Sequence, residues 1–184
     1  MPSSLASPFF ILITMNIPST IFIGYGNPDR QDDGVAWHIL ANLAQKLGKP
    51  VPTSWEEPFE IGKEYPHLLF QLQLNPEVTE TLAQYQIVCF VDAHTGDIPN
   101  DIQFGEVSEG YQTSPFTHHM TAEACLKLTN TLYRSEPKAY LLSVRGYSFG
   151  FAQNLSPQTA FLSAIAANKA WDWLNNLPPD LTGI

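Results

Sequence analysis

Residues 21–34 read IFIGYGNPDRQDDG and indicate the fold class more strongly than any other part of the chain. The stretch begins as a run of β-branched and aromatic residues, breaks into a Gly-x-Gly-Asn turn and leads into apolar residues with helical spacing at 35–44. A strand that passes through a glycine turn into a helix is typical of open α/β folds, whose ligand sites lie at the carboxyl edge of the sheet. The adjacent Asp32 and Asp33 therefore either cap the helix or belong to a metal or acid–base site.

Strands and helices alternate along the rest of the chain. The apolar run at 87–91 is typical of a central strand that is covered on both faces. Residues 50–66 contain four prolines, which predicts a surface loop or insertion. We expect further strands at 67–74, 102–107 and 139–144, and helices at 75–85, 121–133 and 156–174. These elements predict a three-layer α/β/α sandwich around a mostly parallel sheet of about five strands.

The domain organisation follows from the same pattern. We expect a single domain over residues 19–184, because no interior linker divides the alternating elements. Residues 1–18 are expected to form an N-terminal extension that is either flexible or upstream of the true start. The apolar run at 9–13 is preceded by no Lys or Arg and followed by no clear small-residue cleavage site, which argues against a signal peptide.

Charge and composition exclude several classes of partner. The formal net charge is −9, and the nine Lys and Arg residues form no cluster, so a nucleic-acid partner is not expected. No stretch reaches the ~20 apolar residues of a membrane span. Cys89 and Cys125 lie in apolar runs without a Cys-x-x-Cys partner, which is typical of buried thiols in a reducing compartment. We therefore expect a cytoplasmic protein without a membrane partner.

Three polar clusters fall at the ends of predicted elements. Asp32 and Asp33 follow the first strand, Asp92 follows the central strand, and His118 and His119 precede the helix at 121. Because the carboxyl ends of parallel strands share one edge of a sheet, these clusters can converge. Two carboxylates and an imidazole suit nickel, zinc or iron.

Each cluster also has a simpler explanation. Asp32 or Asp33 can cap the following helix, Asp92 can cap a short turn, and the two histidines can belong to a solvated loop. Other chemistries lack their motifs, since the sequence has no His-Glu-x-x-His and no Gly-x-Ser-x-Gly. Asp29 stands where a dinucleotide fingerprint would have its third glycine.

The ordered motifs are similar to those of a known family. They read Gly24-Tyr25-Gly26-Asn27-Pro28-x-Arg30-x-Asp32-Asp33-Gly34-Val35, then Val91-Asp92-Ala93, then Thr117-His118-His119. Together they resemble the nickel-dependent hydrogenase maturation endopeptidases over residues 19–174. The Arg-x-Asp-Asp-Gly and double-histidine forms are most similar to the branch that processes soluble or bidirectional hydrogenases.

The resemblance implies an endopeptidase that removes the C-terminal extension of a [NiFe] hydrogenase large-subunit precursor. It would recognise nickel already inserted in that substrate rather than store an ion of its own. By position, Asp33, Asp92 and His118 would contact the metal and take part in recognition or catalysis, with His119 as the alternative histidine. The supporting residues would be Asp32, Asn27, Gly24 and Gly26.

The sequence departs from the family pattern in two places. Ala36 replaces a glycine that the family often has after the acidic pair, and residues 50–66 are longer than usual. The sequence does not identify the nucleophile or the base: a metal-polarised water can attack, or Asp32 or a ligand carboxylate can act as base. A non-catalytic maturation chaperone and a metallohydrolase for a small substrate are the alternative functions.

Overall fold

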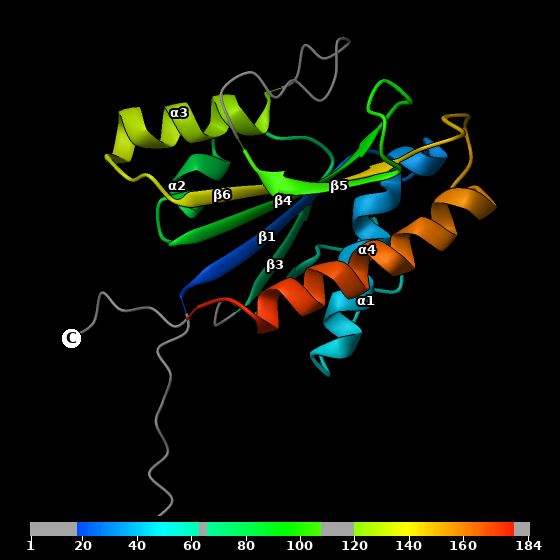
Figure 1. Cartoon of the computed structure of the whole chain (residues 1–184), viewed down its shortest axis with the longest axis horizontal. Coiled ribbons are helices and arrows are strands. Elements are labelled where there is room, and N and C mark those ends of the chain that lie inside the picture. The colour runs from blue at the N-terminus through cyan, green and yellow to red at the C-terminus, as the bar shows by residue number, and fades with distance from the viewer. Residues whose placement is uncertain (1–17, 63–65, 108–119, 179–184) are drawn as a thin grey trace, which may run out of the picture.

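A six-stranded sheet forms the middle layer of the described structure, a computed structural model that covers residues 18–62, 66–107 and 120–178 (Figure 1). The strand order is β2-β3-β1-β4-β6-β5. The four inner strands run parallel, and the two edge strands run antiparallel to their neighbours. The strands are β1 (Thr20–Tyr25), β2 (Glu60–Ile61), β3 (His67–Gln71), β4 (Ile87–His94), β5 (Ile102–Glu106) and β6 (Lys138–Arg145).

Helices cover both faces of this sheet. α1 and α4 pack on one face and α2 and α3 on the other, which confirms the predicted three-layer α/β/α architecture (Figure 1). The sixth strand is the two-residue β2, which lies inside the predicted loop and pairs with β3. The helices are η1 (Gln31–Gly34, a 3-10 turn), α1 (Val35–Lys46), α2 (Val78–Leu82), α3 (Ala122–Tyr133) and α4 (Pro157–Asn175).

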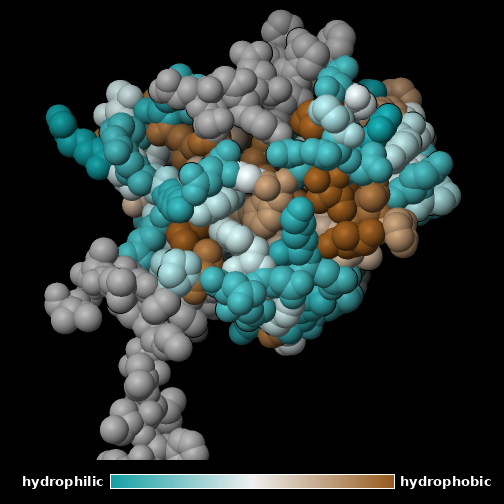
Figure 2. Space-filling model, in the orientation of Figure 1, coloured by the Kyte–Doolittle hydropathy of each residue, from teal (hydrophilic) through white to brown (hydrophobic). Residues whose placement is uncertain are grey.

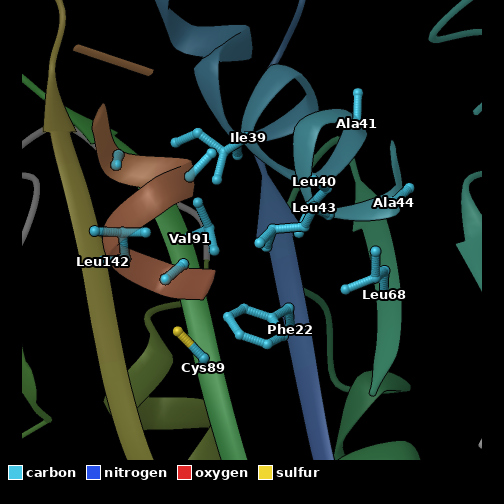
Figure 3. Packing of buried hydrophobic residues seen from close by; sticks show 14 of the residues in the cluster. Phe22, Ile39, Leu40, Ala41, Leu43, Ala44, Leu68, Cys89, Val91 and Leu142 are labelled. Atoms are coloured by element: carbon cyan, nitrogen blue, oxygen red, sulfur yellow. The ribbon is translucent and has the colours of Figure 1, made fainter. Parts of the chain in front are cut away.

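The alternation of side chains in the inner strands divides the core into two layers. Phe22 of β1 and Val91 of β4 face α1 and α4, while Ile21, Ile23 and Phe90 face α2 and α3. Figure 3 shows α1 side chains packed over Phe22 and Val91. Because both faces are buried, the inner strands are nearly continuous in hydrophobicity, as expected of parallel strands between helices.

Two helix starts follow local capping chemistry. The Thr121 hydroxyl accepts a hydrogen bond from the Ala124 N–H at 3.1 Å, and the Ser156 hydroxyl accepts one from the Thr159 N–H at 3.4 Å, with Pro157 in the first turn of α4. The helix predicted from residue 75 is shorter, because Asn75 accepts from the Val78 N–H and α2 begins only at Val78.

The central strand is longer than the sequence predicts. β4 continues to His94, which pairs with Arg145 of β6, so Asp92 lies inside the strand rather than after it. The polar residues at 92–94 break the apolar pattern, while backbone pairing with β6 continues past them. Asp92 still lies near the carboxyl end of β4.

No helix in the described ranges combines the length and the hydropathy that crossing a bilayer requires.

Candidate active site

Two glycines shape the turn that follows β1. Gly26 has a φ of +135°, and a Cβ atom placed there would lie 2.0 Å from the carbonyl oxygen of Asp33. Only glycine fits this position, because both the backbone angle and the contact exclude a side chain. At Gly24, a Cβ atom would lie 2.9 Å from Leu40 Cδ1 and 3.2 Å from Ala36 Cβ. The first glycine therefore lets α1 approach β1, and the second lets the loop fold back beside the strand.

Asp33 is positioned by this folded-back loop. Its Oδ2 oxygen accepts a hydrogen bond from the backbone N–H of Asn27 at 2.8 Å. The side chain of Asn27 in turn accepts from the N–H of Asp29 at 3.0 Å, which closes a local turn. Asp33 as a whole is partly exposed.

Asp92 lies close to Asp33, on the strand next to β1. Its Oδ1 oxygen accepts from the Ala93 N–H at 2.7 Å. Burial raises the pKa of Asp92 to about 7, hydrogen bonds from the Tyr25 side chain and the Ala93 N–H oppose this shift, and the negative charge of Asp33 adds to it. The sheet edge therefore brings together two carboxyl groups that influence each other's charge, and one of them titrates near neutral pH.

The predicted histidines, His118 and His119, lie outside the described residues. The described part of the chain contains no group of three or more His, Cys, Asp or Glu side chains arranged to hold a metal ion. α3, which begins shortly after them, packs on the face of the sheet that also carries Tyr25. The third metal-contacting residue stays a prediction.

Asp32 has a different environment from Asp33. It is fully buried, and its carboxylate accepts five hydrogen bonds. The donors are the N–H groups of Tyr147 (2.7 Å), Ser148 (2.8 Å) and Ser156 (2.7 Å) and the hydroxyls of Ser156 (2.7 Å) and Thr159 (2.8 Å). Burial alone would raise the pKa of Asp32, but the hydrogen bonds outweigh it and hold the pKa below its usual range.

These contacts correct two expectations. The first is that Asp32 or Asp33 caps the helix that follows, since neither η1 nor α1 has a side-chain cap. Asp32 instead lies at the N-terminus of α4, where the helix dipole favours a negative charge. The second is that Asp32 can act as the base, because a buried carboxylate with five donors and a low pKa is poorly suited to take a proton from water.

Gln31 joins the same two loops. Its φ of +51° is unusual for a residue with a side chain, and its Oε1 oxygen accepts from the Ser148 hydroxyl at 2.5 Å and the Gly150 N–H at 3.1 Å. The backbone N–H of Gln31 donates to the carbonyl of Ala152 at 2.8 Å. The loops at 26–34 and 146–156 therefore form one hydrogen-bonded unit at the end of the sheet where α4 begins (Figure 1).

The sequence did not point to several of these supporting residues. The residues that bind Asp32 lie 115 to 127 positions away along the chain, so no local motif signals them. Ser156-Pro157 indicates the start of a helix, but it does not indicate that the Asp32 carboxylate binds there. The missed supports are Tyr25, Gln31, Tyr147, Ser148, Ser156 and Thr159.

His94 is the histidine nearest to Asp92 in sequence, and its ring nitrogens are both engaged. Nδ1 lies 2.8 Å from the Ser143 hydroxyl, and Nε2 lies 3.1 Å from the Asn100 carbonyl oxygen. The side chain is buried, and burial lowers its pKa. His94 is therefore a neutral structural residue that ties the loop after β4 to β6, and it does not substitute for the predicted histidine.

The fold is that of solved hydrogenase maturation endopeptidases. The endopeptidase HybD from E. coli matches with a TM-score of 0.60 and 16% identity, over 85% of this chain and 92% of that chain. The maturation protease HybD from Thermococcus kodakarensis matches with a TM-score of 0.61 and 12% identity, over 85% and 99%. HycI from Thermococcus kodakarensis KOD1 matches with a TM-score of 0.61 and 18% identity, over 86% and 94%. No protein-family model matches the chain, and no curated protein matches it.

Proposed function

We propose that this chain is a hydrogenase maturation endopeptidase of the nickel-dependent family, which removes the C-terminal extension of a nickel-loaded [NiFe] hydrogenase large-subunit precursor. The proximity of Asp33, in the turn after β1, to Asp92, near the carboxyl end of the adjacent parallel strand β4, carries the proposal. The shared fold supports it. The Arg-x-Asp-Asp-Gly and double-histidine forms favour a soluble or bidirectional hydrogenase as substrate, processed in the cytoplasm.

The carboxyl pair is suited to meet a cation that arrives with the substrate. Burial and the charge of Asp33 keep Asp92 partly protonated near neutral pH. A nickel ion carried by the precursor would relieve the repulsion between the two carboxylates and favour loss of the Asp92 proton. Carboxylate and imidazole ligands accept nickel, so His118, or His119, would complete the contact. Nickel is thus part of the substrate in this proposal.

Anchoring the metal would also hold the scissile peptide bond. A substrate that is fixed at two or three points holds its scissile bond close to the reacting groups, which lowers the entropic part of the barrier. Peptide hydrolysis then needs a base that takes a proton from the attacking water and a donor that protonates the leaving amine. Of the two acids at the site whose pKa is shifted, Asp92 is better suited than Asp32 to act as the base, because burial raises the pKa of Asp92 whereas hydrogen bonds hold the pKa of Asp32 below its usual range.

Cleavage of the nickel-loaded precursor by matched variants tests this assignment. We expect Asp33→Asn, Asp92→Asn and His118→Ala each to slow cleavage by roughly 100-fold or more. Asp97→Asn is the control, since Asp97 is an exposed acid in the loop after β4 that binds only the Thr95 hydroxyl among the described residues. The control should cleave at the normal rate. Normal processing by all three site variants would refute the site.

The same experiment separates the alternative functions. A non-catalytic chaperone would bind the precursor and leave its length unchanged. A metallohydrolase for a small substrate would bind metal tightly without any hydrogenase subunit.

A further inference from the structure

The loop at 146–156 carries an exposed aromatic side chain next to the proposed site. Phe151 is 88% exposed, the largest exposed fraction among the described large hydrophobic residues. The guanidinium carbon of Arg30 lies over its ring, 5.1 Å from the centroid. The Nε of Arg30 donates to the carbonyl of Phe149 at 3.1 Å, which fixes the orientation of the guanidinium group. Arg30 and Phe151 therefore form an ordered cation–aromatic pair at the surface.

The backbone around this pair is tied down on both sides. Arg30 forms a backbone bridge with Ala152, and the next residue, Gln31, donates its N–H to the Ala152 carbonyl. On the other side, the side chain of Gln153 donates to Asp29 at 2.9 Å. A single exposed apolar residue is ordinary, but one held on a fixed loop beside a cation has the composition of an interface anchor.

Arg30 is also close to the carboxyl pair in structure. Its carbonyl accepts a hydrogen bond from the N–H of Asp33 at 3.3 Å, so the two residues share one turn. Within the described residues, the terminal amino groups of Arg30 have no hydrogen-bond partner, and the side chain is exposed. Arg30 therefore offers donors in a fork that matches a carboxylate.

The charge of the chain restricts what can approach this turn. The net charge is −9, so an acidic segment would be repelled from most of the surface. Arg30 supplies a local positive charge, and Phe151 supplies apolar surface beside it. Complementarity therefore favours a ligand segment that carries a carboxylate next to an apolar side chain.

We propose that Arg30 and Phe151 bind an acidic–apolar segment of the hydrogenase precursor that flanks the scissile bond, Arg30 pairing with its carboxylate and Phe151 packing against its apolar side chain. The inference rests on the proposed function and adds the chemistry of the segment that is recognised. Both are positioning residues, because they hold the substrate and take no part in bond cleavage.

Steady-state cleavage of the nickel-loaded precursor by Arg30→Ala and Phe151→Ala tests the proposal. We expect KM to rise about tenfold for each variant and kcat to stay within about twofold, because the lost contacts are made equally before and during the reaction. The loss caused by Arg30→Ala should shrink in about 0.5 M NaCl, since salt screens exposed charges. Phe161→Ala is the control, because Phe161 is a 69% exposed phenylalanine on α4, where Figure 2 shows hydrophobic surface.

Precursors in which the acidic residues near the cleavage site are changed singly to Asn or Gln locate the partner of Arg30. One such change should raise KM for the wild-type protein and have no further effect on Arg30→Ala. Arg30→Lys should recover only part of the loss, because lysine keeps the charge without the fork. Thermal unfolding of each variant checks that the loop stays folded.

Different outcomes separate the two proposals. Normal KM values for Arg30→Ala and Phe151→Ala, with an active wild-type protein, would overturn this inference and leave the proposed function standing. A wild-type protein that fails to cleave would overturn the proposed function. Equilibrium binding of the precursor then decides the inference, which predicts about tenfold weaker binding by both variants and is overturned by equal binding.

Discussion

Replacing Asp32 with Asn is the sharpest test of how the site is built. Asn keeps the shape of the side chain but turns one carboxylate oxygen into an N–H₂ group. In the less costly orientation the amide nitrogen takes the place of Oδ1 and faces only the N–H of Ser156. In the other it faces the four donors that bind Oδ2. The folded variant should therefore adopt the first orientation.

The cost follows from the five hydrogen bonds. One bond to a charged acceptor is lost, worth roughly 1.5–3 kcal/mol, and its buried donor is left unpaired. The four remaining bonds lose their charge assistance, roughly 0.5 kcal/mol each. Allowing for relaxation, we expect the free energy of unfolding to fall by about 4 kcal/mol and the Tm by roughly 12 °C.

Urea unfolding at pH 7 measures this change, with Asp29→Asn as the control. Asp29 lies in the same loop, and its carboxylate accepts a single exposed side-chain bond, from Gln153, so its replacement should cost less than about 0.5 kcal/mol. Because the folded-state pKa of Asp32 is lowered, its contribution is present above the ordinary value of 3.8 and is lost as the pH falls through the folded-state value. A loss of under about 1 kcal/mol at pH 7 for Asp32→Asn would refute the reasoning.

Two further predictions concern the turn and the carboxyl pair. Gly26→Ala should lower the free energy of unfolding by at least about 2 kcal/mol and abolish cleavage, because the new Cβ atom would collide with the Asp33 carbonyl. Gly48→Ala is the control, since Gly48 also has a positive φ but has open space around it. Equal losses of stability in the two variants would contradict the prediction. The raised folded-state pKa gives wild-type Asp92 a stabilising contribution that is complete below 3.8 and is lost as the pH rises through about 7, so the stability of Asp92→Asn relative to wild type should rise by roughly 4 kcal/mol between pH 4 and pH 8. Urea unfolding at several pH values checks this, and parallel curves for the two proteins would rule it out.

The sequence predicts the layers and most elements because their signals are local. The run of β-branched and aromatic residues that opens the 21–34 segment predicted β1, and the helical spacing of apolar residues at 35–44 predicted α1. Ser156-Pro157 predicted the start of α4. The predicted end of β4 was wrong, because the pairing of His94 with Arg145 depends on β6, a strand that follows much later in the chain. The local sequence around residues 92–94 does not indicate such a distant pairing partner.

The candidate site divides in the same way. The Gly-x-Gly turn and the acidic pair are visible in one stretch, and the parallel topology predicts that Asp33 and Asp92 come together. Which acid is buried is not visible, since the two are adjacent and alike in sequence. That difference arises because the donors around Asp32 come from residues 147–159, beyond the reach of a motif.

Mass spectrometry of the precursor before and after incubation with this protein tests the central claim most directly. A nickel-loaded large subunit should lose the mass of its C-terminal extension in a single cut, while the nickel-free subunit and the reaction with Asp92→Asn should keep their full mass. A nickel-loaded precursor whose mass is unchanged by the wild-type protein, or one that is cut equally well without nickel, would contradict the account.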